Sequence, residues 1–178
     1  MAGKYKIVTT GEGVSATRET MITYINTGTA DAPVWSAMGA KVTESSIEYE
    51  WGVKNDTDIL GNAYTTAKTA QLSQSFGGSE IIAGDAVMNH LVDLAVVQKD
   101  AAKLVNQDCL VASLYLRDDD GNAFAERYPA SAVVPTSIGG EGGGALVTNI
   151  DVNYGGARVG GIIKKTADGV TFTPDVTV

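Results

Sequence analysis

Residues 47–53 read Ile-Glu-Tyr-Glu-Trp-Gly-Val, with apolar and acidic side chains at alternate positions. Successive side chains of a β-strand point to opposite faces, so this alternation predicts a strand with one buried and one solvated face. The face predicted to be buried, against a helix or an opposing sheet, comprises Ile47, Tyr49, Trp51 and Val53. The solvated face would carry Glu48 and Glu50. The functional question is what surrounds this acidic face.

Similar patterns predict several more strands. The strand that contains residues 47–53 would span about 44–54. The remaining strands are expected at 20–26, 63–76, 109–117, 123–134 and 145–154, with a hairpin at 158–173 turning at Ala167-Asp168-Gly169. Asp118-Asp119-Asp120-Gly121-Asn122 carries the Asp-Gly signal of a tight hairpin.

Helical spacing of apolar residues is clear only over 85–98, where Asp85 is a suitable N-cap. About eight strands and one helix predict a mainly β fold, an antiparallel β-sandwich or barrel with one flanking α-helix. We expect a polar, glycine-containing N-terminal arm at 1–19 and a single domain at 20–178. The glycine-rich stretch at 135–144 is expected to be a loop.

Composition excludes several classes of function. The 178 residues carry a net charge of −8, so the basic footprint of a nucleic-acid-binding protein is missing. Cys109 is the only cysteine, which rules out an internal disulfide and favours a buried, inert thiol. No signal peptide is evident in residues 1–10, and no apolar run is long enough to span a membrane. A reducing, cytoplasmic origin fits.

No group of residues predicts catalysis, a cofactor or a metal. His90 is the only histidine and has no partner set. Glu48 and Glu50 would lie about 7 Å apart, a separation also found in glycosidases, but two glutamates on one strand face more often form a solvated surface. The glycines at 139–144 lack the lysine and hydroxyl of a phosphate-binding loop. The aspartates at 118–120 lack the later glutamate of a calcium loop.

The segment at 55–62 is predicted to be a loop with an exposed apolar tip, Ile59 and Leu60, which lies between Asp58 and Gly61. The strand after it would have one face of small, mostly polar residues: Thr65, Ala67, Thr69, Gln71, Ser73 and Ser75.

The order of these features resembles that of the major tail tube proteins of long-tailed bacteriophages. The resemblance rests on the early strand, the apolar piece around Trp35, the strand ending near Trp51, the Asn-Asp-Thr-Asp-Ile-Leu-Gly loop at 55–61, and Ser-Gln-Ser-Phe at 73–76 leading to the helix after Gly84-Asp85. It covers most of the chain and is strongest over 20–100. Its motifs are patterns rather than an invariant signature.

The resemblance implies a structural subunit that forms hexameric rings, which stack into a hollow tube. The inner sheets of six subunits would join into one β-barrel, and viral DNA would pass through the lumen into the host without specific binding. Implied partners are further copies of the chain, tail terminator and tip or baseplate proteins, and a tape-measure protein, but no membrane. The chain would be assembled in the host cytoplasm and reside in the virion tail.

These expectations assign two sets of site residues. The residues predicted to line the lumen are Glu48, Glu50, Thr69, Gln71 and Ser73. The residues predicted to form the contact between rings are Asp56, Asp58, Ile59 and Leu60. The resemblance leaves open whether the tail contracts, and we favour the non-contractile kind. The alternative interpretation is a β-sandwich module that binds a carbohydrate or a receptor on a virion or cell surface.

Overall fold

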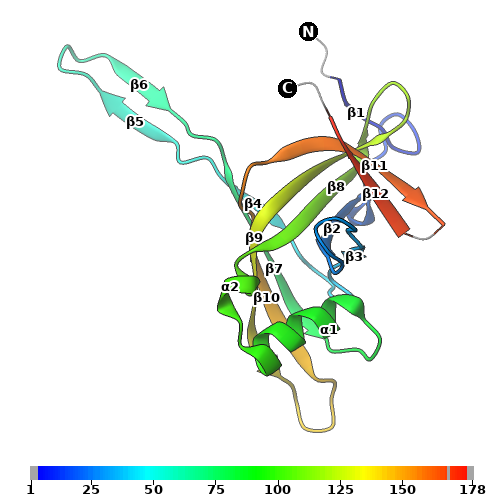
Figure 1. Ribbon diagram of the computed structural model, residues 1–178. Coiled ribbons are helices and arrows are strands. Elements are labelled where there is room, and N and C mark those ends of the chain that lie inside the picture. The colour runs from blue at the N-terminus through cyan, green and yellow to red at the C-terminus, as the bar shows by residue number, and fades with distance from the viewer. Residues whose placement is uncertain (1–3, 168, 176–178) are drawn as a thin grey trace.

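The computed structural model describes residues 4–167 and 169–175 (Figure 1). This part of the chain contains the strands β1 (Lys6–Ile7), β2 (Met21–Asn26), β3 (Trp35–Ala37), β4 (Ile47–Glu50), β5 (Lys54–Thr57), β6 (Ala63–Thr66), β7 (Gln71–Glu80), β8 (Gln107–Arg117), β9 (Ala123–Gly139), β10 (Val147–Asn153), β11 (Val159–Thr166) and β12 (Gly169–Pro174). Its helical elements are α1 (Ala86–Val92), a π-helical turn η2 (Asp93–Gln98), α2 (Ala101–Leu104) and a 3-10 turn η1 (Arg18–Thr20). All strand pairs are antiparallel, and the predicted mainly β class is confirmed.

Ten strands form one hydrogen-bonded system with two parts. We call the order β3-β2-β8-β9-β11-β12 the curled sheet, because β12 at one end comes back against β3 at the other. We call the order β9-β10-β7-β4 the four-stranded sheet. The 17-residue β9 belongs to both, since its first half pairs with β8 and β11 and its second half with β10.

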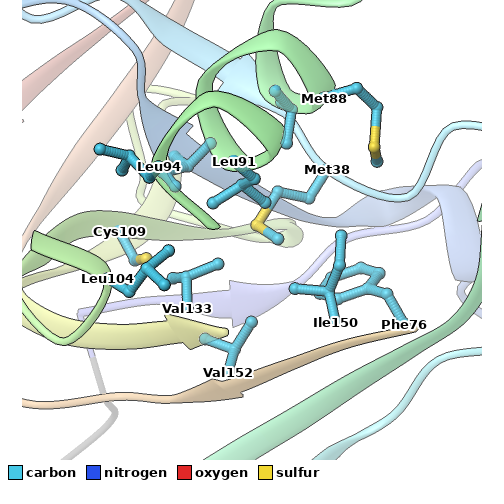
Figure 2. Packing of buried hydrophobic residues seen from close by; sticks show 12 residues of the cluster. Met38, Phe76, Met88, Leu91, Leu94, Leu104, Cys109, Val133, Ile150 and Val152 are labelled. Carbon is cyan, nitrogen blue, oxygen red and sulfur yellow. The ribbon is translucent and has the colours of Figure 1, made fainter. Parts of the chain in front are cut away.

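Two hydrophobic cores follow from this arrangement. One fills the curled sheet and includes Tyr24, Trp35 and Leu110. The other lies between α1–η2 and the four-stranded sheet, as Figure 2 shows. Its buried members are Ile25, Met38, Phe76, Val87, Met88, Leu91, Leu94, Leu104, Cys109, Val133, Ile150 and Val152. The neighbours Cys109 and Leu110 of β8 belong to different cores, so this strand is buried on both faces.

The predicted helix at 85–98 is confirmed as α1 continued by η2. The carboxylate of Asp85 accepts hydrogen bonds from the backbone N–H of Val87 and Met88, at 2.8 and 3.0 Å, which is the N-cap expected from the sequence. Lys99 then takes a left-handed conformation with φ of 53° and ends the helix. The short α2 was not predicted, because four residues are too few to display a helical period.

Three predicted boundaries are wrong. The single strand expected over 44–54 is interrupted at 51–53, where Gly52 has a positive φ of 52° that breaks the extended chain. The strand expected over 63–76 divides into β6 and β7, and β7 continues through its two glycines to Glu80. The loop expected from 135 begins only after Gly139, because pairing with β10 extends β9 that far.

The remaining hairpins are as predicted. β8 and β9 flank the Asp-Gly turn, and β11 and β12 form the C-terminal hairpin, whose turn residue Asp168 lies outside the described residues. Part of the segment expected as an N-terminal arm is joined to the curled sheet: Lys6 and Ile7 pair with β8, and the ring of Tyr5 lies 4.7 Å from that of Phe124.

Candidate assembly surfaces

The outward face of the four-stranded sheet is polar. Glu48 lies opposite Ser73, and Glu50 opposite Gln71, in the antiparallel register of β4 and β7. Residues directly opposite one another in such a pair share a face of the sheet. Four of the five residues predicted to line a lumen are therefore neighbours on one face. The fifth, Thr69, is exposed in the connector before β7 and lies outside the sheet.

The third strand, β10, extends this face. Asn153 lies opposite Ser73, and Asp151 lies opposite Ser75. The hydroxyl of Ser75 donates a 2.7 Å hydrogen bond to the Asp151 carboxylate. The side-chain oxygen of Asn149 accepts a 2.8 Å bond from the backbone N–H of Gly78. These bonds hold the polar side chains flat against the strands.

We call this surface the polar face. It comprises Glu48, Glu50, Gln71, Ser73, Ser75, Asn149, Asp151 and Asn153. It carries three carboxylates and no lysine or arginine, so all of its charged side chains are negative. Phosphate groups facing such a surface are repelled.

The prediction that the other side of the 47–53 segment is buried is wrong for three of its four residues, and only Ile47 is partly buried. Tyr49 and Trp51 are 53% and 52% exposed, and Val53 is exposed as well. The two aromatic rings stack with their centroids 6.3 Å apart. The helix α1–η2 packs over the end of the sheet around Phe76 and Ile150, whereas Tyr49 and Trp51 at the other end border an open groove.

An open groove of about 740 Å³ lies beside this aromatic pair. Tyr128 and Tyr154 line its floor with their rings 5.1 Å apart, and burial raises the pKa of both phenols. Arg158 pairs with the carboxylate of Glu126 at its rim. The groove has apolar walls and one ion pair, but no nucleophile set beside a base among its described lining residues.

The four-stranded sheet has two open edges. Among the described residues, β4 pairs only with β7, and the second half of β9, from residue 132, pairs only with β10. Pairing of β9 with β8 ends at Ser131, opposite Gln107. Pro135 fits an edge position because proline has no N–H to donate. The other unpaired backbone groups along these edges can pair with a strand of another chain.

The hairpin β5–β6 projects from the body as a separate arm (Figure 1). All its residues from 51 to 69 are exposed, and a 2.9 Å bond from the Lys68 N–H to the Trp51 carbonyl closes its base. The segment at 55–62, predicted to be a loop with an apolar tip, is thus the end of a hairpin. Its tip is as exposed as expected, with Ile59 fully and Leu60 about four-fifths accessible.

The turn at the arm tip occurs twice in the molecule. Asp58-Ile59-Leu60-Gly61-Asn62 and Asp118-Asp119-Asp120-Gly121-Asn122 share the pattern Asp-x-x-Gly-Asn. In both, the aspartate carboxylate accepts from the backbone N–H two and four residues on and from the asparagine side chain. The glycines have φ of 83° and 80°. These bonds, the asparagine side chain foremost, lower the pKa of Asp58 and of Asp118.

The other residues with reactive side chains, the histidine and the cysteine, occupy structural positions. The His90 ring lies 2.8 Å from the side-chain oxygen of Gln107. Cys109 is fully buried, as predicted, and burial raises the pKa of its thiol to about 12, which makes it inert at neutral pH. The described residues contain no group of three or more potential metal ligands. No helix among them is long and apolar enough to cross a membrane.

The sequence therefore predicted the acidic strand face and the exposed arm tip, but not the exposed aromatic pair. The alternation of β10 already separated Asn149, Asp151 and Asn153 from the buried residues. What it could not reveal is that this strand lies next to β7, because strand order leaves no local trace in the sequence.

No protein-family model and no curated protein matches the chain. Among solved structures, a chain of the anti-feeding prophage cap, described as a tube terminating cap, matches with a TM-score of 0.47 and 12% identity over 94% of this chain and 97% of that one. A chain of the extended sheath–tube complex of an extracellular contractile injection system matches with a TM-score of 0.44 and 9% identity, over 85% and 94%. A chain of the sheath/tube terminator of such a system matches with 0.46 and 8%, over 84% and 99%. All three TM-scores lie below 0.5, so the proposed function rests on the geometry of this chain itself.

Proposed function

We propose that this chain is a structural subunit that assembles through its sheet edges into the tail tube of a long-tailed bacteriophage. The observation that carries this proposal is the four-stranded sheet, which has a polar, acidic outward face between two open edges. An unpaired edge exposes backbone N–H and C=O groups that can pair with a strand of another chain. Pairing β4 of one copy with the second half of β9 of the next satisfies both.

Repeated pairing of this kind closes a ring whose inner wall is one continuous sheet. The resemblance to tail tube proteins implies six subunits per ring. If the polar face lines the lumen, each subunit contributes Glu48, Glu50 and Asp151 to it, next to small hydroxyl and amide side chains. DNA carries one negative charge per ~1.7 Å of its axis, so such a wall repels the duplex and lets it slide.

The arm supplies a contact between rings. An isolated two-stranded hairpin is marginally stable in water, so β5–β6 gains most by docking on another subunit. Ile59 and Leu60 would be buried in that contact, with Asp56 and Asp58 beside them. Burying two such side chains contributes about 3–6 kcal/mol before the cost of ordering the arm.

The tube would act with other tail proteins. A terminator would cover one end, tip or baseplate proteins the other, and a tape-measure protein would occupy the lumen before DNA. Assembly in the host cytoplasm and residence in the virion tail complete this proposal. Sheet-edge pairing and arm docking are equally compatible with a contractile and a non-contractile tail.

Negative-stain electron microscopy of the purified full chain, over a range of concentrations and with tail tip components added, tests the proposal. We expect stacked rings of constant diameter with a hollow centre. A chain that stays monomeric under all these conditions contradicts it.

The exposed Tyr49–Trp51 pair favours a second candidate function, a carbohydrate- or receptor-binding module. Stacked aromatic rings beside an open groove are suited to the apolar face of a sugar. Glycan binding by a stable monomer that loses affinity when Trp51 becomes alanine supports this candidate over the tube.

A further inference from the structure

The apolar side chains at the arm tip are not required by the turn that carries them. Ile59 and Leu60 occupy the positions of Asp119 and Asp120 in the second copy of the same turn, which forms the same hydrogen bonds. The turn itself therefore accepts exposed carboxylates at both positions, of which Asp119 pairs with Lys6. Exposing two large apolar side chains to water is unfavourable. Their presence at the arm tip therefore indicates that another surface buries them.

An apolar groove with room for them lies on the N-terminal side of the curled sheet. Its lining includes Val8, Val14 and Leu114, and its volume is about 440 Å³. Val8 and Val14 are about half exposed. An apolar cavity of roughly 150 Å³ holds a benzene molecule, so this groove has room for two aliphatic side chains.

The charges at the two places are complementary. The outer part of the arm, residues 55–66, carries Asp56 and Asp58, and the two lysines of the arm, Lys54 and Lys68, lie at its base. Arg117 borders the groove, is exposed, and donates one N–H to the carbonyl of Gly121 at 3.1 Å. Within the described residues it has no ion pair. If the arm docks in the groove, the carboxylate of Asp56 could form an ion pair with the guanidinium of Arg117.

The arm and the groove cannot meet within one chain. In Figure 1 the arm extends to one side of the body, whereas β1, which precedes Val8, lies on the opposite side. A contact between them must join two copies. Such a contact uses different surfaces on the two copies, so each added copy leaves one arm and one groove free. Repeating the contact builds either a closed ring or an open filament.

We propose that the Ile59–Leu60 tip of one copy inserts into the groove formed by Val8, Val14 and Leu114 of another copy, with Asp56 facing Arg117. This inference rests on the proposed self-assembly and names the acceptor of the arm. The occupant is a second copy of this chain.

Engineered cysteines test the contact directly. Leu60→Cys combined with Val14→Cys in the full chain is expected to form disulfide-linked multimers under mild oxidation of the assembled protein. The native Cys109 is fully buried and does not compete. The matched control is Leu60→Cys with Val97→Cys, since Val97 is also an exposed valine but lies on η2, outside the groove. We expect at least about tenfold more cross-linked product from the first pair.

A charge exchange supplies a second measurement. Asp56→Arg and Arg117→Asp, each alone, place like charges together and should raise the concentration needed for assembly by about tenfold. The double variant should restore most of the loss, which is the signature of a direct contact.

The outcomes separate this inference from the proposed function. Tubes that form without the Leu60–Val14 cross-link, and a double variant no better than the single ones, overturn the acceptor and leave the tube subunit standing. A chain that remains monomeric in every condition overturns both.

Discussion

At the residue scale, the two tryptophans differ most in what surrounds them. Trp35 is buried in the curled sheet, where the guanidinium of Arg127 lies 5.8 Å from its ring, whereas Trp51 is half exposed at the base of the arm. Both lie in apolar sequence stretches, and alternation alone predicted that Trp51 is part of a core. Trp35 is enclosed by the strands of the curled sheet, whereas Trp51 lies just after β4 and borders an open groove.

The two tryptophans therefore predict opposite responses to truncation. Trp35→Ala should lower the free energy of unfolding by about 3–5 kcal/mol, the usual cost of deleting a buried aromatic side chain. Trp51→Ala should lower it by less than about 1 kcal/mol, because a side chain already in contact with water loses little. Urea unfolding of dilute, monomeric protein measures both. A loss near ~3 kcal/mol for Trp51→Ala would mean that this face is covered in the free chain.

Sequence patterns do not predict which polar residues are buried, as Gln74 shows. Gln74 interrupts the apolar face of its strand, yet it is buried, with only 3% of its surface exposed. Its side-chain oxygen accepts a 2.8 Å hydrogen bond from Thr23, and its amide donates a 2.9 Å bond to Ser45. These partners come from 51 and 29 residues away, so no local window could have assigned this glutamine to the interior.

At the element scale, the arm is a hairpin in which the two residues at the tip can be replaced without changing the turn. The chain itself contains the control, since the turn at 118–122 has the same backbone bonds with aspartates in place of Ile59 and Leu60. An acidic tip should therefore fold as well as the natural one.

The double substitution Ile59→Asp with Leu60→Asp should shift the thermal midpoint of the monomer by no more than about 2 °C. It should raise the concentration needed for assembly at least about a hundredfold, because two buried side chains are lost from the contact. Light scattering and electron microscopy measure assembly, and circular dichroism measures the midpoint. Ile59→Leu with Leu60→Met, which keeps the tip apolar, is the control and should assemble. Unchanged tube growth by the acidic variant would remove the tip from any contact.

The elements themselves were predictable where their signals are local. The Asp85 cap, the Asp-Gly turn of 118–122 and the alternation of β10 each depend on a few neighbouring residues. The break at 51–53 and the extension of β9 to Gly139 were not, since both depend on which strand lies alongside. The polar face was half predictable: β4 and β7 were assigned to it, whereas Asp151 joined it only through the pairing of β10 with β7.

At the scale of the whole molecule, the polar face and the sheet edges serve separate purposes. Edge pairing uses the backbone of β4 and β9, whereas the side chains of Glu48 and Glu50 point away from the sheet. Their charge can therefore be reversed without removing the bonds that would close a ring.

Glu48→Lys with Glu50→Lys should leave ring formation largely intact and make the lumen attractive to DNA. Particles carrying this variant should eject DNA more slowly, and isolated tubes should retain duplex DNA in sedimentation assays. The retention should be strong near ~50 mM salt and largely lost by about 200 mM, because phosphate contacts weaken as released counterions become abundant. Normal ejection, with no retained DNA at low salt, would place these glutamates away from the channel.

The continuity of β9 has a mechanical consequence. One main chain runs through both the curled sheet and the four-stranded sheet, and it is hydrogen-bonded on the way to β8, β11 and β10. A pull on β9 at the four-stranded sheet is thus transmitted to the curled sheet through covalent bonds, and extracting β9 itself requires shearing its ladders with β8, β11 and β10. Tension between the two sheets is therefore carried along one covalent strand and not across a non-covalent interface.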